Sequence, residues 1–299
     1  MSTIRSKVLF LNIHMHHKNG HSISKYSNID FQYIHHPNEI NNYNLSEFDC
    51  VYSPAIPIDV SLYPNTRFIF GPHFSVLPDE KLLFIKSPRS SFIILSEWIK
   101  NLWKRFPICN NLHLVDIPFG VDTSRFSPTL PFKERSTVFI YFKGRDPADL
   151  AFIQRALDVL GISYRVFGYS NRYDESEYLR YLQESKYGIW VDAHESQGFA
   201  LQEALSCDVP LFVWNISSFN QEYGSNYPDV PATTVPYWDD RCGECFYYKD
   251  DFSHRFEQFL RNIVIEKFKP REYIMENLSM EVCEKRFIHL ITTNTLLDA

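Results

Sequence analysis

The segment from Trp190 to Leu211, WVDAHESQGFALQEALSCDVPL, carries the clearest structural signal in this chain. It begins within a short apolar run, 187–192, of the kind that forms a strand buried on both faces of a parallel sheet. A polar turn at Glu195 follows, and a helix is predicted from 198 to 206. The next apolar run, 209–213, predicts another buried strand. The segment therefore has the strand–helix–strand order of an α/β protein.

The same alternation of apolar runs and helical patterns extends in both directions. In the second half of the chain, strands are predicted at 137–142 and 164–167, and helices at 147–160, 174–185, 250–268 and 279–295. An irregular stretch is expected from the strand at 209–213 to about residue 245. In the first half, strands are predicted at 7–13, 31–34, 50–53, 67–71, 91–96 and 112–117, and helices at 78–86 and 97–106. Ser96 is the expected N-cap of the helix at 97–106.

A Pro- and Ser-rich linker at 122–133 separates two sets of this pattern. A chain of 299 residues is long enough for two domains with separate cores. The predicted fold class is therefore α/β, with two Rossmann-like, doubly wound parallel-sheet domains at 1–128 and 129–299. They are expected to face each other across a cleft, with the last helix, 279–295, packed back on the first domain. Ligands of such sheets bind beyond the carboxyl ends of the strands, so the chemistry is expected in the loops there.

Composition excludes several classes of protein. Hydrophobic residues make up 44% of the chain and charged residues 22%, which excludes disorder, collagen and coiled coil. There are only 10 glycines, and neither a G-x-G-x-x-G nor a G-x-x-x-x-G-K-[ST] loop is present, so dinucleotide and P-loop enzymes are not favoured. The net charge is −6 and there is no long basic run, so nucleic acid is not an expected partner.

The N-terminal segment has only a short apolar run before polar histidines, which predicts a strand and neither a signal peptide nor a membrane span. Six scattered cysteines without a secretion signal are typical of reduced thiols. The expected location is therefore the cytoplasm, with no transmembrane segment, and peripheral membrane contact is left open.

Two groups of residues invite a metal or redox interpretation. Cys242 and Cys245 form one C-x-x-C pair, but a zinc site needs a second pair, for which only Cys207, Cys283 and His254 are candidates. The sequence favours two ordinary cysteines in a turn. The second group consists of His14, His16, His17 and His21. No carboxylate lies nearby in the sequence to complete a metal site, so a polar loop after the first strand is favoured.

The helix predicted to open near Gly198 offers an anion site. Its first N–H groups have no partner within the helix and would face the cleft, where they can hold a phosphate without a metal ion. Glu195 and Glu203 flank this end, and carboxylates accept strong hydrogen bonds from sugar hydroxyls. The alternative is a solvated helix acid together with a turn acid that complements the helix dipole.

The spacing of these two acids resembles a known motif. Glu195 to Glu203 looks like the E-x7-E motif of retaining GT-B glycosyltransferases of the family-4 type (glycosyl transferases group 1), and the neighbouring Gly-Phe, Glu-Ala-Leu and Val-Pro-Leu residues match it too. The stretch 117–128, IPFGVDTSRFSP, resembles the junction signature of that family, and Ser96 matches its serine before a helix. The resemblance covers about residues 66–295 and implies the GT-B architecture.

The resemblance assigns roles by position. It implies that Glu195 contacts hydroxyls of the donor sugar and that Glu203 holds the nucleotide ribose. The backbone amides of Gln197, Gly198 and Phe199 would then lie against the sugar and the diphosphate. The base pocket is expected to draw on the loop after 167–168 and on the segment Pro236-Tyr-Trp-Asp.

The turn after the strand at 137–142 reads Lys143-Gly144-Arg145, where the family has a Gly-Arg pair that holds the diphosphate. The resemblance implies that role for Arg145. The family also has a lysine a few residues later, where this chain has Asp149, and Lys143 is the candidate replacement. The alternative for Lys143 and Arg145 is a solvated loop.

In the first domain, His73 ends the Phe-Gly-Pro-His turn, where the family often has a cleft histidine near the reacting sugar. Two features depart from the family pattern: the Gly-Gly loop after the first strand is missing, and the first domain is short. Both departures concern the part of the first domain that would bind the acceptor.

The inferred activity is transfer of a hexose from a nucleoside diphosphate sugar, a UDP- or GDP-sugar, to an acceptor hydroxyl with retention of configuration. No cofactor and no metal are expected, since the chain lacks an Asp-x-Asp. The acceptor would be a glycan, a glycoprotein or a small molecule. The first alternative is a degenerate GT-B domain that only binds nucleotide sugars or glycans. The others are a nucleotide-sugar epimerase or an inverting transferase with His73 or a cleft acid as base, and the metal or redox protein considered above.

Overall fold

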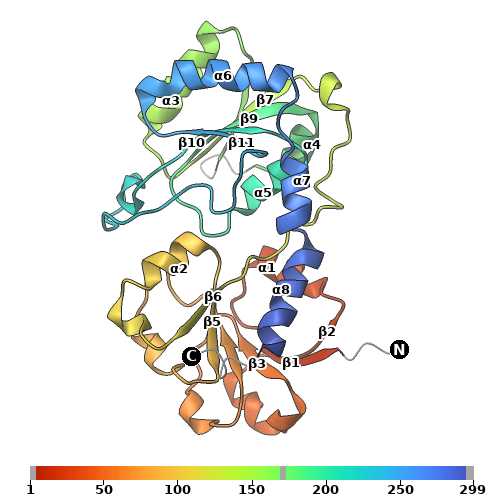
Figure 1. Ribbon diagram of the computed structural model, residues 1–299, viewed down its shortest axis with the longest axis vertical. Coiled ribbons are helices and arrows are strands. Elements are labelled where there is room, and N and C mark those ends of the chain that lie inside the picture. The colour runs from red at the N-terminus through yellow and green to blue at the C-terminus, as the bar shows by residue number, and fades with distance from the viewer. Residues whose placement is uncertain (1–4, 169–172, 294–299) are drawn as a thin grey trace. The chain divides into compact units, whose positions relative to one another are not determined.

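The apolar runs of the two halves form two separate parallel sheets in the computed structural model, which describes residues 5–168 and 173–293 (Figure 1). The chain divides into two units, each with its own sheet. Unit 1 consists of Met1–Gly120 and Met280–Ala299, and unit 2 of Val121–Ser279. The chain therefore passes between the units twice, and the sequence-based boundary at residue 128 falls inside unit 2.

Unit 1 contains a six-stranded sheet with the order β2-β1-β3-β4-β5-β6, in which all neighbours are parallel. Three of its strands are buried at every position, as expected for a sheet covered on both faces. The strands are β1 (Ser6–Leu11), β2 (Ile29–Ile34), β3 (Cys50–Ser53), β4 (Phe68–Phe70), β5 (Ser90–Ile94) and β6 (His113–Asp116).

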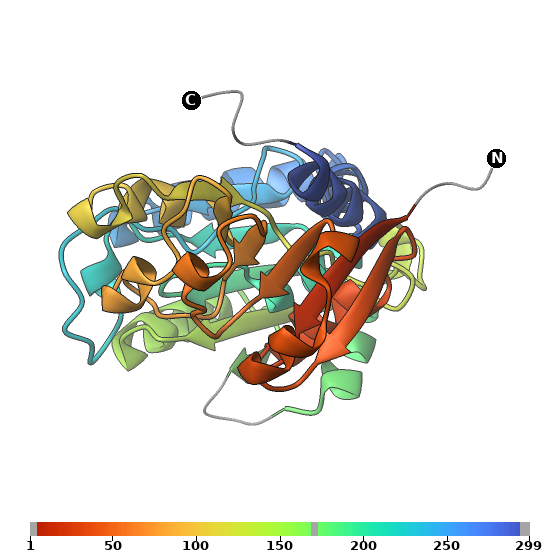
Figure 2. The ribbon, with the colours of Figure 1, turned by 90° about the horizontal axis from the view of Figure 1, so that it is seen from below.

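The helices of unit 1 are α1 (His17–Ser24), α2 (Glu97–Trp103) and α8 (Met280–Thr292). Helix α8 lies beside β1 although most of the chain separates them in sequence (Figure 2). Phe287 of α8 packs on Tyr52 with ring centroids 5.3 Å apart, and Arg67 donates to the carbonyl of Ile291 at the end of the helix. These contacts make α8 an integral part of the core of unit 1. The helix predicted at 279–295 ends at Thr292, and residues 294 and 295 lie outside the described residues.

Unit 2 contains a five-stranded parallel sheet with the order β11-β10-β9-β7-β8. Its strands are β7 (Thr137–Lys143), β8 (Arg165–Gly168), β9 (Ser185–Asp192), β10 (Leu211–Trp214) and β11 (Gly243–Phe246). The chain runs from β7 to β8 at one edge and then returns past β7 to β9. The strand order therefore reverses between β7 and β9.

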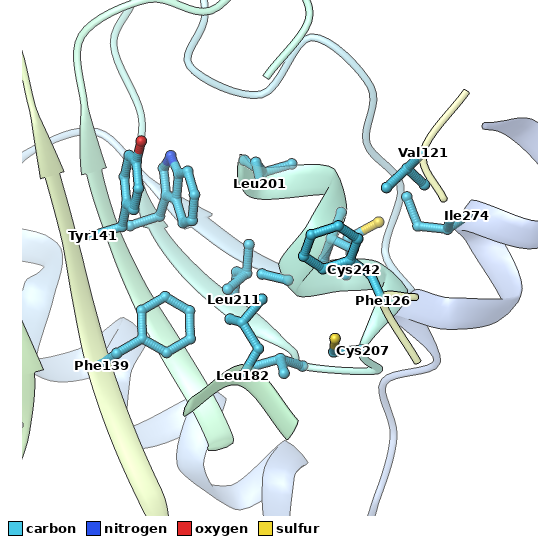
Figure 3. Packing of buried hydrophobic residues seen from close by; sticks show 14 of the residues in the cluster. Val121, Phe126, Phe139, Tyr141, Leu182, Leu201, Cys207, Leu211, Cys242 and Ile274 are labelled. Carbon is cyan, nitrogen blue, oxygen red and sulfur yellow. The ribbon is translucent and has the colours of Figure 1, made fainter. Parts of the chain in front are cut away.

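The helices of unit 2 are α3 (Pro147–Val159), α4 (Glu175–Glu184), α5 (Phe199–Ser206), α6 (Phe252–Val264) and α7 (Pro270–Asn277). Helix α5 is buried from Leu201 to Ser206 and contributes Leu201 to a core that also holds Tyr141 and Leu211 (Figure 3). Tyr141 stacks on Trp190 with ring centroids 4.0 Å apart. Because α5 is enclosed by apolar side chains, its position relative to β7 and β9 is fixed by packing.

The structure confirms the predicted α/β class with two doubly wound parallel sheets, and it confirms the helix opening at Gly198. The polar loop expected after the first strand holds for His14 and His16 but is wrong for His17 and His21, because α1 begins at His17. Asn19, Ser22 and Ile23 are buried there, and Ser22 Oγ accepts a hydrogen bond of 2.9 Å from the backbone N–H of Gly120. Docking on the rest of the unit therefore overrides the weak helix propensity of this polar stretch.

The helix predicted at 78–86 is also wrong, because only a 3-10 turn forms, at Glu80–Leu83. The Asp79 carboxylate accepts from the N–H of Lys81, a local bond that favours a tight turn over a longer helix. Ser96 has the extended backbone of an N-cap, but its side chain makes no capping hydrogen bond. The position was predicted correctly and the contact was not.

The stretch expected to be irregular up to about residue 245 contains β11, and the predicted helix 250–268 ends at Val264. A separate helix, α7, then starts with Pro270 in its first turn. Strand β11 depends on Gly243, whose φ is +143°. A Cβ at this position would lie 1.9 Å from the carbonyl oxygen of Leu211, so only glycine lets β11 approach β10.

Candidate functional site

The candidate residues of unit 2 converge at the point where its strand order reverses. β7 and β9 are neighbours, and their last residues, Lys143 and Asp192, are paired in the register. The chain leaves β7 toward one edge of the sheet and leaves β9 toward the other. The two loops separate there, which is the position at which doubly wound sheets bind ligands.

A lysine and two carboxylates meet at this point. Lys143 Nζ forms an ion pair with Glu195, and it lies 4.0 Å from Oδ2 of Asp192. The Lys143 and Glu195 side chains are partly exposed, whereas that of Asp192 is fully buried. The ammonium group is therefore shared between an accessible and a buried carboxylate, and two of the sequence candidates, Lys143 and Glu195, are in direct contact.

Asp192 is the least accessible member of this group. Its Oδ1 accepts a hydrogen bond of 2.7 Å from the N–H of Ala193. Burial raises the pKa of Asp192 well above its ordinary value, and the charge of Glu195 raises it further, while Lys143 opposes both effects. Removal of Lys143 would therefore take away the one described cation that lowers the pKa of Asp192.

A histidine and a third carboxylate lie beside this pair. His194 Nδ1 is 2.9 Å from Oε2 of Glu222, which follows β10 in the chain. Burial lowers the pKa of His194 to about 4, so its ring is neutral at pH 7. Burial also raises the pKa of Glu222. Among the described residues, the site therefore combines several oxygen acceptors with the flexible cation of Lys143, a balance suited to hydroxyl groups as well as to one anionic group.

The backbone of Glu195 is fixed by the loop that follows β10. The N–H of Glu195 donates to the carbonyl of Thr233. Asn215 holds this loop, since its Oδ1 accepts from the hydroxyl of Thr233 at 3.0 Å and from the N–H of Thr234 at 2.9 Å. The position of the Glu195 carboxylate therefore depends on both β9 and the segment after β10.

Helix α5 begins next to Glu195. Gly198 is its N-cap with φ +70°, and no described side chain caps the helix by a hydrogen bond. Gln197 is buried, and its carbonyl accepts from the side chain of Gln202 one turn later. Phe199, the first helical residue, is partly exposed. The start of this helix therefore lies directly beside the Glu195 turn, and the N-terminus of a helix can bind an anion.

Gly144 allows the two loops to approach each other. Its φ is +62°, and a Cβ there would lie 3.1 Å from Cβ of Ala193. Its carbonyl accepts a hydrogen bond of 2.8 Å from the N–H of Tyr223. Gly144 therefore holds the loop after β7 close to both the β9 turn and the segment that carries Glu222.

Arg145 is placed differently from Lys143. Its side chain is 6% exposed and pairs with Asp149 at 2.8 Å. The guanidinium group also donates to the carbonyl of Trp214 at 3.3 Å and lies over its ring at 5.0 Å. Arg145 thus connects the first turn of α3 with the end of β10, and a phosphate would have to compete with these partners.

Glu203 lies one helical turn into α5 and is 2% exposed. Its charge is one of the causes that raise the pKa of the buried Tyr178, whose hydroxyl donates to the carbonyl of Ala200. The structure therefore places Glu195 at the accessible end of α5 and Glu203 inside it. The loop after 167–168, expected to contribute to a base pocket, lies outside the described residues.

The remaining candidate, His73, belongs to unit 1. It follows β4, and its Nε2 lies 3.1 Å from Nδ2 of Asn19, a buried residue of α1. Burial and the nearby His16 lower the pKa of His73 to about 4. A neutral imidazole at the carboxyl end of the sheet can accept a proton or a hydrogen bond.

Sequence reasoning missed three residues of the site: Asp192, His194 and Glu222. Asp192 and His194 stand within the quoted 190–211 segment, where a charged residue at the end of an apolar strand is the signal that identifies Asp192. Glu222 lies in the stretch expected to be irregular, and no local pattern connects it to the site.

The metal interpretations gain no geometric support. Over residues 5–168 and 173–293, no three His, Cys, Asp or Glu residues are arranged to hold a metal ion. Burial raises the pKa of Cys242 and of Cys245 to about 12, which makes both thiols poor nucleophiles. A search of the same residues for a helix long and apolar enough to cross a membrane finds none.

No protein-family model matches the sequence, and no curated protein sequence matches it. Solved structures do match. AviGT4, a glycosyltransferase involved in avilamycin A biosynthesis, has a TM-score of 0.58 at 12% identity, over 98% of this chain and 99% of that chain. Sucrose-phosphate synthase from Thermosynechococcus elongatus has a TM-score of 0.56 at 10% identity, over 96% and 98%. The apo form of the lipopolysaccharide outer core galactosyltransferase WaaB has a TM-score of 0.52 at 14% identity, over 96% and 99%.

These similarities extend over almost the whole length of both chains. Together with the two parallel α/β sheets, they show that the chain has the GT-B architecture of two Rossmann-like domains. At these identities the similarity establishes the fold, and the activity has to be argued from the site.

Proposed function

We propose that this protein is a glycosyltransferase that moves a sugar from a nucleoside diphosphate sugar to an acceptor hydroxyl, with retention of configuration and without a metal ion. The observation that carries the proposal is the meeting of Lys143, Glu195 and the start of α5 at the strand reversal between β7 and β9. The fold shared with three sugar-transferring proteins supports it.

The charge distribution suits a donor with two chemically different parts. Departure of a nucleoside diphosphate develops negative charge, which Lys143 and the N–H groups at the start of α5 would stabilise. The Glu195 carboxylate would accept hydrogen bonds from hydroxyls of the donor sugar. Lys143 pairs with Glu195, and we infer that the diphosphate of a bound donor replaces this carboxylate as the partner of Lys143.

The other candidates take supporting roles in this proposal. Gln197, Gly198 and Phe199 would supply backbone N–H groups, and Gly144 would keep space for the diphosphate between the loops. Glu203 would accept from the ribose, which requires that the buried start of α5 becomes accessible to the nucleotide. Arg145 would act on the diphosphate mainly through the position of the loop that it anchors. His73, a residue of unit 1, would act on the reacting sugar.

A protein that binds nucleotide sugars without transferring them is the second candidate. The observation that favours it is the ion pair between Arg145 and Asp149. Arg145 is the cation expected to bind the diphosphate, and here its charge is already paired with a carboxylate. Such a protein would bind donors, and variants of Lys143 would lose this binding, but no product would form with any acceptor.

The test is turnover with UDP- and GDP-sugars, with the configuration of the product read by proton NMR. We expect Lys143→Ala to lower kcat/KM by about 10²-fold, the usual cost of removing one group that stabilises a developing charge. Lys133→Ala, at a side chain that is 83% exposed, should leave it unchanged. An inverted product would exclude retention, and donor binding without turnover would support the second candidate.

A further inference from the structure

A hollow in unit 1 has no role in the proposed transfer reaction. It has a volume of about 500 Å³ and lies between β6 and α8. Strand β6 is the last strand of its sheet, so its outer edge pairs with no other strand of that sheet. The volume falls within the range of sites that bind small organic molecules.

The floor of this groove is apolar. Val115 and Ile117 contribute to it from β6 and the residue after it, and Val282 and Leu290 contribute from α8. Val115 and Val282 are partly exposed, whereas Ile117 and Leu290 are buried. An apolar ligand that covered this floor would remove exposed hydrocarbon from water, which is favourable in proportion to the area covered.

The rim of the groove is cationic. Lys285 and Arg286 are exposed on α8, and neither forms an ion pair with another described residue. Asp116 is the one carboxylate among the described lining residues, and it is already paired with Lys100. Burial lowers the pKa of His113, and the charges of the nearby Arg67 and Lys100 lower it further.

We propose that the groove binds one amphiphilic anion, a molecule with a single alkyl chain and a carboxylate head group. The chain would lie on the apolar floor, and the carboxylate would bind Arg286 and Lys285 at the rim, where the arginine fork matches its two oxygens. A nucleotide sugar does not fit this description, because its many hydroxyls would have few partners on the floor. The site is distinct from the candidate donor residues of unit 2.

The test is calorimetric titration of the full chain with monomeric dodecanoate, below the concentration at which it forms micelles. We expect saturable binding of one molecule per chain. Dodecyltrimethylammonium has the same alkyl length and the opposite charge, and it should bind at least tenfold more weakly. Hydrogen exchange should slow at 113–117 and 282–293 when dodecanoate is bound.

The matched variants reverse two charges each. Lys285→Glu/Arg286→Glu should lower the affinity for dodecanoate at least tenfold. Lys104→Glu/Arg105→Glu, a pair of exposed basic residues at the end of α2, should not change it. Because all four side chains are exposed, both variants are expected to fold, and circular dichroism checks this.

Three results would overturn the proposal: equal affinity for the anion and the cation, unchanged affinity after reversal of Lys285 and Arg286, or binding only after residues 294–299 are deleted. The last result would assign the groove to the end of the chain itself. The outcome is independent of the transferase proposal, which rests on residues of unit 2 and on His73.

Discussion

Lys143 is the residue on which the chemistry of the candidate site depends most. It pairs with Glu195 and lies 4.0 Å from the buried Asp192, so one ammonium group offsets two carboxylates. An anionic ligand that drew this lysine away would leave Glu195 free to accept from a neutral hydroxyl. In the proposed reaction, the pair would thus couple recognition of the phosphate to recognition of the sugar.

His73 allows a prediction about pH at the same scale. Its pKa is about 4 in the folded chain, against an ordinary value of about 6.5. The unfolded chain therefore takes up a proton as the pH falls from 6.5 to 4, and the folded chain does not. Above pH 6.5 the histidine is neutral in both states, so it does not change the free energy of unfolding there. Between pH 6.5 and pH 4 the free energy of unfolding should fall by up to about 3 kcal/mol.

The measurement is urea unfolding of the wild type and of His73→Gln at pH 7, 5.5 and 4.5. The variant does not titrate at this position, so its free energy of unfolding should fall less steeply than that of the wild type. Parallel pH dependences would show that His73 is protonated in the folded state and would contradict the burial-lowered pKa.

At the scale of elements, the start of α5 depends on Gly198. Its φ is +70°, and a Cβ there would lie 3.6 Å from its nearest neighbours. Alanine therefore fits sterically, but its left-handed backbone conformation costs free energy. Gly198→Ala is expected to lower the free energy of unfolding by about 1 kcal/mol. Gly20→Ala, inside α1 with open space around it, should raise it by up to about 1 kcal/mol. Chemical denaturation measures the free energy of unfolding of both variants. An unchanged free energy of unfolding for Gly198→Ala would contradict the left-handed conformation of this N-cap.

Arg145 is expected to act as a brace between α3 and β10. Arg145→Ala would remove the partner of Asp149 and two hydrogen bonds to buried carbonyls, so the free energy of unfolding should fall by about 2–3 kcal/mol. Denaturation with urea measures this. A variant that keeps its stability but loses affinity for nucleoside diphosphates would show instead that Arg145 is mainly a ligand of the donor.

The sequence allows prediction of elements where a single local pattern dominates. The strands from β7 to β10 each contain a short apolar run, their predicted boundaries hold to within two residues, and Gly198 marks the start of α5. Helix α1 and β11 could not be predicted in the same way. The first forms because its polar residues dock on Gly120 and His73, and the second because Gly243 lets it approach Leu211. Both depend on contacts distant in sequence.

The same distinction holds for the site. Glu195 and Lys143 follow predicted strands, and because those strands are neighbours in the sheet, the two side chains meet. Glu222 follows β10 through a segment without periodicity, so its approach to His194 is determined by tertiary structure alone. Arg145 was identified by its motif, but its enclosure by Asp149 and Trp214 depends on a strand 69 residues away.

At the scale of the whole molecule, each unit has its own sheet and its own core, and the donor-site candidates other than His73 lie in unit 2. A nucleoside diphosphate should therefore protect one unit first. We expect saturating UDP or GDP to slow hydrogen exchange at 143–149 and 192–199 and to raise the stability of unit 2 by about 2.7 kcal/mol at one hundred times the Kd. Exchange followed by mass spectrometry measures both, and protection confined to unit 1 would contradict the assignment.

The most direct test of the central claim is release of nucleoside diphosphate from UDP- and GDP-sugars in the presence of a glycan acceptor. It compares the wild type with Glu195→Gln and with Glu257→Gln, an exposed glutamate of α6 whose partner is Arg261. Loss of a charged hydrogen bond of about 1.5–3 kcal/mol predicts a rate about 10- to 100-fold lower for Glu195→Gln and an unchanged rate for Glu257→Gln. A wild type that releases nucleotide at a rate equal to that of Glu195→Gln would contradict the account.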